Sequence, residues 1–236
     1  MTSSIFDIEI SQKSLKETEQ IIFKNIKENK KIHVVTANSE MLYLTTKDSK
    51  LKNILQKADI VTPDGVGSVW AAKKLSKPVK ERVAGFDLLT SLLKNGSNIN
   101  IFLLGANNNV VKKAAEKIAN NYPNINIVGF HDGYFDDNEK IIEVINQSET
   151  EILFVALGCP KQEYWIRENF NKLRLNVAMG VGGSFDVIAG EVKRAPKLWQ
   201  KLGLEWAYRL IKQPSRFKRM LALPKFVMKV LLTKEK

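Results

Sequence analysis

Short apolar segments alternate with amphipathic segments along most of this 236-residue sequence. This order predicts a parallel β-sheet, because parallel strands are buried on both faces and need a long crossover between them. We therefore expect an α/β fold, a Rossmann-like parallel sheet with helices on both faces. Six strands are expected, at residues 33–38, 59–64, 100–105, 125–130, 151–158 and 175–181.

The alternation ends near Gly190. Residues 191–236 hold 13 Lys or Arg and 3 Asp or Glu, a net charge of +10, whereas residues 1–190 have a net charge of +2. Helical spacing there, interrupted by Pro214 and Pro224, predicts a small helical C-terminal appendage on a core at 1–190. A basic tail suits nucleic acid, an anionic membrane surface or a phosphorylated ligand, but it also suits helices with a solvated basic face.

Several classes of protein are excluded by what the sequence lacks. A single cysteine rules out an intrachain disulfide, and two distant histidines argue against a zinc site or a Ser-His-Asp hydrolase. There is no P-loop and no dinucleotide-binding glycine fingerprint. No apolar run reaches the roughly 20 residues of a membrane span, and the N-terminus does not resemble a signal peptide, so we expect a cytoplasmic protein.

Asp64 is the most informative single residue. It stands between an expected strand at 59–64 and an expected helix at 66–75, flanked by Pro63 and Gly65. Open α/β sheets bind ligands at the carboxyl ends of their strands, where a carboxylate can serve as a catalytic base. Asp is also a preferred N-cap residue, so the same position is compatible with a helix cap.

Other polar or glycine-rich segments follow the remaining strands. If the sheet is doubly wound, these segments converge with Asp64 on one crevice, and the glycines let backbone amides approach a phosphate. They are Thr36, Asn38, Gly105, residues 158–163 and residues 182–186.

Two further features have alternative explanations. The run Asp132-Gly133-Tyr134-Phe135-Asp136-Asp137 suggests a divalent metal, but Asp beside Gly more often forms a turn, and we predict no metal. Cys159 lies at a strand end, where it suggests a catalytic nucleophile. Free cysteine, however, is most often a small buried apolar residue.

The tail has basic residues at helical spacing. Arg209, Lys212, Arg216 and Arg219 share one face if the helix continues through Pro214. Apolar and aromatic residues lie between them, which is typical of a helix on an anionic membrane surface.

Taken together, the sequence motifs resemble the TagA/WecG/CpsF-type glycosyltransferases, glycosyltransferase family 26, over roughly residues 5 to 230. The resemblance rests on the order of several motifs. They are Thr36-Ala37-Asn38, Thr62-Pro63-Asp64-Gly65, Arg82-Val83-Ala84-Gly85, Gly158-Cys159-Pro160-Lys161-Gln162-Glu163, residues 182–190, Lys193-Arg194-Ala195-Pro196, and Leu204-Glu205-Trp206 with Arg209.

The resemblance implies an inverting, metal-independent transfer without a cofactor. The expected donor is a UDP-sugar of the N-acetylmannosamine type, and the expected acceptor is a polyprenyl-diphosphate-linked N-acetylglucosamine. In Gram-positive members the product is the linkage disaccharide of wall teichoic acid. We accordingly expect peripheral association with the inner face of the cell membrane, and a homo-oligomer is compatible with the resemblance.

The resemblance also assigns residues. It implies that Asp64 is the base and that Thr36, Asn38, Arg82 and Gln162 are polar active-site residues. The expected substrate-binding residues are Gly65, Gly105, Tyr134, Gly183, Ser184, Phe185, Asp186, Arg209, Arg216 and Arg219.

Two alternatives stay open. One is the same family with a different donor, such as a uronic acid form of the sugar. The other is an α/β nucleotide- or nucleic-acid-binding module whose tail binds phosphate backbones with strong salt dependence. Against the second, the sequence has no recognised nucleic-acid-binding motif, and we expect no nucleic-acid partner.

Overall fold

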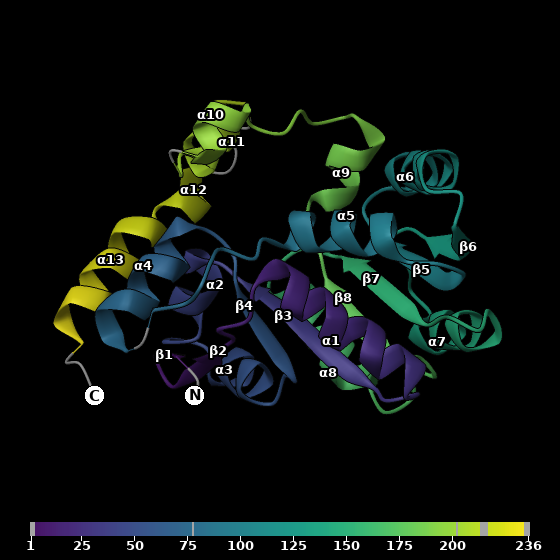
Figure 1. Ribbon diagram of the computed structural model, residues 1–236, viewed down its shortest axis with the longest axis horizontal. Coiled ribbons are helices and arrows are strands. Elements are labelled where there is room, and N and C mark those ends of the chain that lie inside the picture. The colour runs from purple at the N-terminus through teal and green to yellow at the C-terminus, as the bar shows by residue number, and fades with distance from the viewer. Residues whose placement is uncertain (1–2, 77, 202, 213–216, 234–236) are drawn as a thin grey trace.

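A six-stranded parallel sheet forms the centre of the protein (Figure 1). The computed structural model describes residues 3–76, 78–201, 203–212 and 217–233. Within them the strand order is β4-β3-β8-β7-β5-β6, which confirms the predicted Rossmann-like α/β fold. The strands are β3 (Ile32–Ala37), β4 (Ile60–Pro63), β5 (Ile99–Gly105), β6 (Ile125–His131), β7 (Ile152–Ala156) and β8 (Val177–Gly180).

The apolar strands bury side chains on both faces of the sheet. In β7, Ile152 and Phe154 join one buried cluster, whereas Leu153 and Val155 join the cluster on the other face. Such two-sided burial explains why these segments are almost uniformly apolar. One face carries α1 (Leu15–Lys27), α5 (Gly85–Asn95), α6 (Asn108–Asn121) and α9 (Ser184–Ala189). The other carries α2 (Ser39–Leu44), α3 (Ser49–Gln56), α4 (Val66–Leu75), α7 (Asn138–Gln147) and α8 (Lys161–Asn169).

A short N-terminal hairpin was not expected from the sequence. Its strands, β1 (Ser3–Ile5) and β2 (Ile8–Ile10), pair antiparallel and bury three isoleucines completely. The turn places Phe6 and Asp7 at positive φ, at 53° and 66°. Turns of this kind usually contain Asn or Gly, so this sequence lacks the usual hairpin signal.

The C-terminal appendage is helical, as predicted. Its helices are α10 (Lys197–Lys201), α11 (Glu205–Lys212), α12 (Phe217–Met220) and α13 (Ala222–Leu232). Pro224 does not interrupt α13, because it lies in the first turn, where no N–H donor is needed. In Figure 1, α13 lies beside α2 and α4 at one edge of the molecule.

Two side chains attach α13 to the rest of the protein. Phe226 and Val230, one turn apart, are buried in the same apolar cluster as the N-terminal hairpin. The Phe226 ring meets the Phe6 ring edge-on, with 5.8 Å between centroids. Residues on both sides of the predicted domain boundary near residue 190 share this apolar cluster. The division into a core and an appendage stays a prediction.

His33 in β3 is a buried histidine without polar partners in the described part of the chain. Its side chain packs near the Phe170 ring, and neither ring nitrogen has a hydrogen-bond partner there. Burial, assisted by the charge of Arg167, lowers the pKa of His33 to about 4. The unfolded chain therefore binds a proton more readily than the folded chain, and acid destabilises the fold between about pH 6.5 and pH 4.

Replacing His33 should remove this acid sensitivity. Between pH 7.5 and pH 5, we expect the free energy of unfolding to fall by about 2 kcal/mol less in His33→Leu than in wild type. Urea unfolding at the two pH values measures the difference. His131→Leu, at the partly exposed second histidine, is the matched control. An equal loss of stability in wild type and His33→Leu would contradict the assignment.

Candidate active site

A cavity of about 450 Å³ lies at the carboxyl ends of β3, β4, β7 and β8. This is the edge of a parallel α/β sheet where ligands bind, and the volume suits a small-molecule site. The floor comes from the core and the roof from the appendage. Floor residues include Thr36, Asn38, Asp64, Gly85, Gly158, Gln162, Gly182 and Ser184; roof residues are Arg194, Gly203, Glu205, Trp206, Met220, Leu223, Phe226 and Val227.

Asp64 does not cap the helix that follows it. The N-cap of α4 is Gly65, whose φ of 102° and ψ of 158° suit glycine alone and which makes no side-chain cap bond. Instead, Asp64 Oδ2 accepts a hydrogen bond of 3.2 Å from the backbone N–H of Gly85, the first residue of α5. The carboxylate thus faces the partial positive charge of another helix N-terminus.

Thr36 and Asn38 define the neighbouring wall. Thr36 approaches the start of α5 so closely that a Cβ at Gly85 would lie 2.7 Å from its Oγ1. Asn38 caps α2, because its side-chain oxygen accepts from the backbone N–H of Met41 at 2.9 Å. Asn38 also lines the cavity, and a side-chain amide carries NH₂ donors as well as the oxygen used in the cap.

Gln162 and Glu163, at the start of α8, form a buried pair below the glycine segment that follows β8. Gln162 Oε1 accepts from Gly182 N–H at 3.0 Å, while its Nε2 donates to Glu163 Oε1 at 2.7 Å. Glu163 therefore fixes the orientation of the Gln162 amide. Burial raises the pKa of Glu163 to about 7, although the hydrogen bond from Gln162 opposes the shift.

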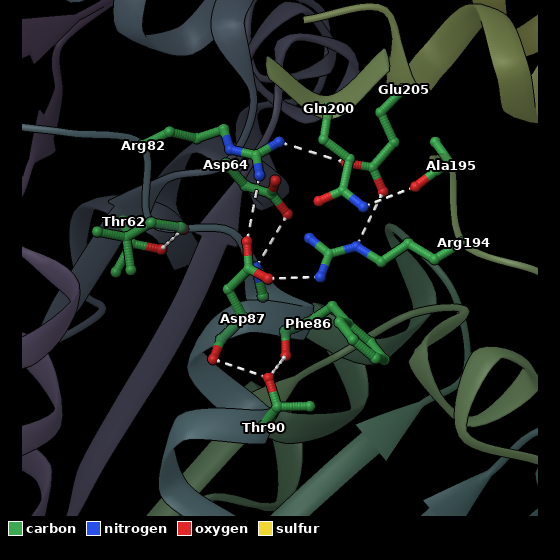
Figure 2. A network of polar contacts seen from close by, with 12 residues as sticks. Thr62, Asp64, Arg82, Phe86, Asp87, Thr90, Arg194, Ala195, Gln200 and Glu205 are labelled. Atoms are coloured by element: carbon green, nitrogen blue, oxygen red, sulfur yellow. Dashed lines mark hydrogen bonds and ion pairs between the residues drawn. The ribbon is translucent and has the colours of Figure 1, made fainter. Parts of the chain in front are cut away.

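Two arginines and two carboxylates join the core to the roof (Figure 2). Asp87 in α5 forms ion pairs with Arg82 and Arg194, with nitrogen–oxygen distances of 3.2 Å and 2.6 Å. Glu205 in α11 forms an ion pair with Arg82 at 3.3 Å. Arg194 Nε lies 3.6 Å from Glu205. Burial opposes the charge of Arg194, but Asp87 and Glu205 outweigh it and raise its pKa. The network is charge-balanced and borders the cavity.

The sequence as a whole settles the family. The sequence model of the glycosyl transferase WecG/TagA/CpsF family matches residues 3–236. The chain belongs to this family. The resemblance inferred from the motifs is thereby confirmed. Family membership favours a glycosyl transferase over the alternative of a nucleic-acid-binding module.

Three similar proteins share one name, N-acetylglucosaminyldiphosphoundecaprenol N-acetyl-beta-D-mannosaminyltransferase. The protein of Bacillus spizizenii is 40% identical over 206 residues, covering 86% of this chain and 80% of the relative. That of Bacillus subtilis strain 168 is 40% identical over 200 residues, covering 84% and 78%. That of Staphylococcus aureus strain MW2 is 36% identical over 208 residues, covering 87% and 82%.

The cavity brings together eight of the residues predicted for the glycosyl transferase site. They are Thr36, Asn38, Asp64, Gly65, Arg82, Gln162, Gly183 and Ser184. Four others do not line it. Gly105 is the last residue of β5 and Tyr134 follows β6. Both strands lie beyond β7 from the cavity, and Tyr134 is 82% exposed. Phe185 is wholly buried in the core, and Asp186 lies beside it in α9.

The structure does not describe the side chains of the three arginines predicted in the tail. Arg209 lies in α11 and Arg219 in α12, and the description there is limited to the helix backbone. Arg216 falls outside the described residues. Their expected role in substrate binding stays a prediction.

Sequence reasoning missed several residues of the cavity and its supports. Arg194, Glu205 and Trp206 all fall within quoted motifs, but nothing in those motifs indicates that they meet the core. Glu163 belongs to the segment 158–163 that was expected in the crevice, but the sequence did not indicate that it orients the Gln162 amide. No group of three or more His, Cys, Asp or Glu arranged to hold a metal occurs among the described residues.

Replacing the buried Glu163 should make stability less sensitive to alkali. The folded chain holds the Glu163 proton up to about pH 7, whereas the unfolded chain loses it near pH 4.5. Wild-type stability therefore falls as pH rises from 4.5 to 7. We expect Glu163→Gln to be more stable than wild type by roughly 3 kcal/mol at pH 8 and equal to it at pH 4.

Denaturant titrations at these two pH values measure the effect. Glu168→Gln, an exposed position on the same helix, is the control and should leave stability unchanged. A stability difference for Glu163→Gln that does not vary with pH would contradict burial of a titrating carboxyl.

Proposed function

We propose that this protein transfers N-acetylmannosamine from UDP-N-acetylmannosamine to undecaprenyl-diphosphate-linked N-acetylglucosamine. The product would be the linkage disaccharide of wall teichoic acid. Family membership and the shared name of relatives at 36–40% identity support the acceptor and the sugar. The observation that carries the proposal is the position of Asp64, on the cavity floor at the N-terminus of α5.

Asp64 is the base in this proposal. A hydroxyl of the acceptor sugar attacks the anomeric carbon on the face opposite the leaving UDP, and Asp64 takes the hydroxyl proton. The new C–O bond forms as the bond from the anomeric carbon to the diphosphate oxygen breaks. The relatives' names specify a beta-linked product, and a beta product from an alpha-linked nucleotide sugar requires inversion.

Cationic and backbone groups stabilise the leaving diphosphate. Arg82, Gly183 and Ser184 line the cavity, and the backbone N–H of Gly183 is the proposed amide donor, since the N–H of Gly182 already donates to Gln162. Such preorganised donors act strongly where water is excluded. The roof formed by α11 and α13 supplies that exclusion. The proposal routes no step through a metal ion.

The appendage is proposed to contact an anionic membrane surface and the lipid of the acceptor. Of fifteen large apolar side chains that are exposed in the described residues, ten lie between Leu198 and Leu232. On α13, Met228 and Leu231 are each 59% exposed on the side opposite Phe226 and Val230, with Lys225 and Lys229 nearby. Basic and apolar residues on one helix surface suit such contact. No helix in the described ranges is long and apolar enough to span a bilayer.

Asp64→Asn should abolish most turnover while retaining the fold and UDP binding. A general base contributes about a hundredfold to ten-thousandfold in rate, and the amide cannot accept the proton. Mass spectrometry of product formed from UDP-N-acetylmannosamine and a short-chain lipid-diphosphate acceptor, with and without EDTA, measures the effect. Asp136→Asn, exposed after β6, is the control. Full activity of Asp64→Asn would disprove the role, and inhibition by EDTA would disprove metal independence.

Polar substitutions on the exposed face of α13 should weaken membrane binding. We expect Met228→Gln/Leu231→Gln to bind vesicles that contain anionic lipid roughly tenfold less tightly, because two apolar side chains no longer enter the membrane. Vesicle sedimentation measures this affinity. Phe130→Gln/Val144→Gln, at apolar positions of similar exposure on β6 and α7, is the control. If both variants bind vesicles equally well, the exposed face of α13 does not contact the membrane.

A further inference from the structure

Arg194 occupies an unusual position for a residue of a structural linker. It lies between α9 and α10, yet its side chain reaches the cavity and is only 20% exposed. Its guanidinium stacks on the Phe86 ring, with Cζ 4.7 Å from the ring centroid. Figure 2 shows Arg194 and Arg82 approaching Asp87 and Glu205 from opposite sides. Two guanidinium groups therefore share one small region beside Asp64.

One donor of Arg194 has no hydrogen-bond acceptor in the described residues. Its Nε is buried, and the nearest carboxylate oxygen, on Glu205, is 3.6 Å away, beyond hydrogen-bonding range. Buried donors normally have a partner, so an unsatisfied one beside a cavity needs an explanation. An oxygen of a bound ligand would supply the missing acceptor.

The ligand must be strongly anionic to compete with the carboxylates already present. Arg82 and Arg194 are neutralised by Asp87 and Glu205, and a neutral sugar offers nothing to displace them. A diphosphate carries more charge than one carboxylate and offers several oxygens to two planar guanidinium groups.

We propose that Arg194 binds the diphosphate of a substrate together with Arg82, and that Glu205 occupies the diphosphate's place in the empty site. This inference rests on the proposed function, which supplies two diphosphates, one in the donor and one in the acceptor. On ligand entry, the two guanidinium groups exchange the Glu205 carboxylate for phosphate oxygens. Phe86 holds the Arg194 plane during the exchange.

The proposal differs measurably from a role in attaching the roof. If Arg194 and Glu205 only hold α11 on the core, loss of either loosens the roof and weakens all ligands together. If Arg194 binds diphosphate and Glu205 competes with it, the two substitutions change diphosphate selectivity in opposite directions.

The experiment compares ligands with and without the diphosphate. Isothermal titration calorimetry measures the binding of UDP against uridine and of a ten-carbon prenyl diphosphate against the matching alcohol. The proteins are wild type, Arg194→Gln, Arg194→Lys, Glu205→Gln and the control Arg174→Gln. Arg174 is exposed and precedes β8, at the opposite end of the sheet.

Arg194→Gln should reduce the preference for diphosphate over its phosphate-free counterpart by about tenfold to a hundredfold in one ligand pair, because a charge-assisted hydrogen bond is lost. Arg194→Lys should lose less, Glu205→Gln should raise the preference, and Arg174→Gln should not change it. The ligand pair that responds identifies the donor or the acceptor as the source. Should Arg194→Gln fold poorly, Arg194→Lys and Glu205→Gln still give opposite shifts.

Two results would overturn the inference. If wild type prefers diphosphates but the Arg194 and Glu205 variants keep that preference, or lose it together, Arg194 is not a diphosphate ligand and the proposed function stands. If wild type shows no preference in either pair, the proposed function fails and this inference fails with it.

Discussion

The hydrogen bond from the N-terminus of α5 to Asp64 determines the geometry on which the site depends. It joins the loop after β4 to the helix that carries Asp87, and so sets the distance between the base and the arginine network. Beside this bond, Gly85 lies so close to Thr36 that a Cβ would come within 2.7 Å of the Thr36 Oγ1, and Gly65 adopts a φ of 102°. A side chain at Gly85 would clash with Thr36 and displace the start of α5, and the hydrogen bond from Gly85 to Asp64 would be disturbed.

Sequence patterns identified the sheet well because its strands are buried on both faces. Uniform apolar segments such as β7 are strong signals, and polar residues directly after them mark the ligand-binding edge. The N-terminal hairpin was missed because its turn uses Phe6 and Asp7 in place of glycine or asparagine. Pro224 was read as an interruption because sequence alone does not show that a helix begins two residues before it.

The sequence predicted the site residues that stand at the carboxyl ends of strands, but it did not show which of those strands are neighbours. Thr36, Asn38 and Asp64 share the cavity because β3 and β4 are adjacent, while Gly105 ends β5 and Tyr134 follows β6, on the other side of β7. Strand order depends on long-range pairing, which local periodicity does not encode. For the same reason the meeting of Arg194 with Asp87, more than a hundred residues earlier in the chain, has no signal in the local sequence.

Attachment of the roof and binding of anions can be separated in this structure. Burial of a Phe or Val side chain contributes about 1.5–3 kcal/mol, so Phe226 and Val230 anchor α13 through apolar contacts alone. The ion pairs around Arg82 and Arg194 instead join α11 and the linker between α9 and α10 to α5, and no side chain of α13 takes part in the ion pairs described there. Because the apolar anchor of α13 does not include Glu205, that carboxylate can be exchanged for a ligand's phosphate while α13 stays over the cavity.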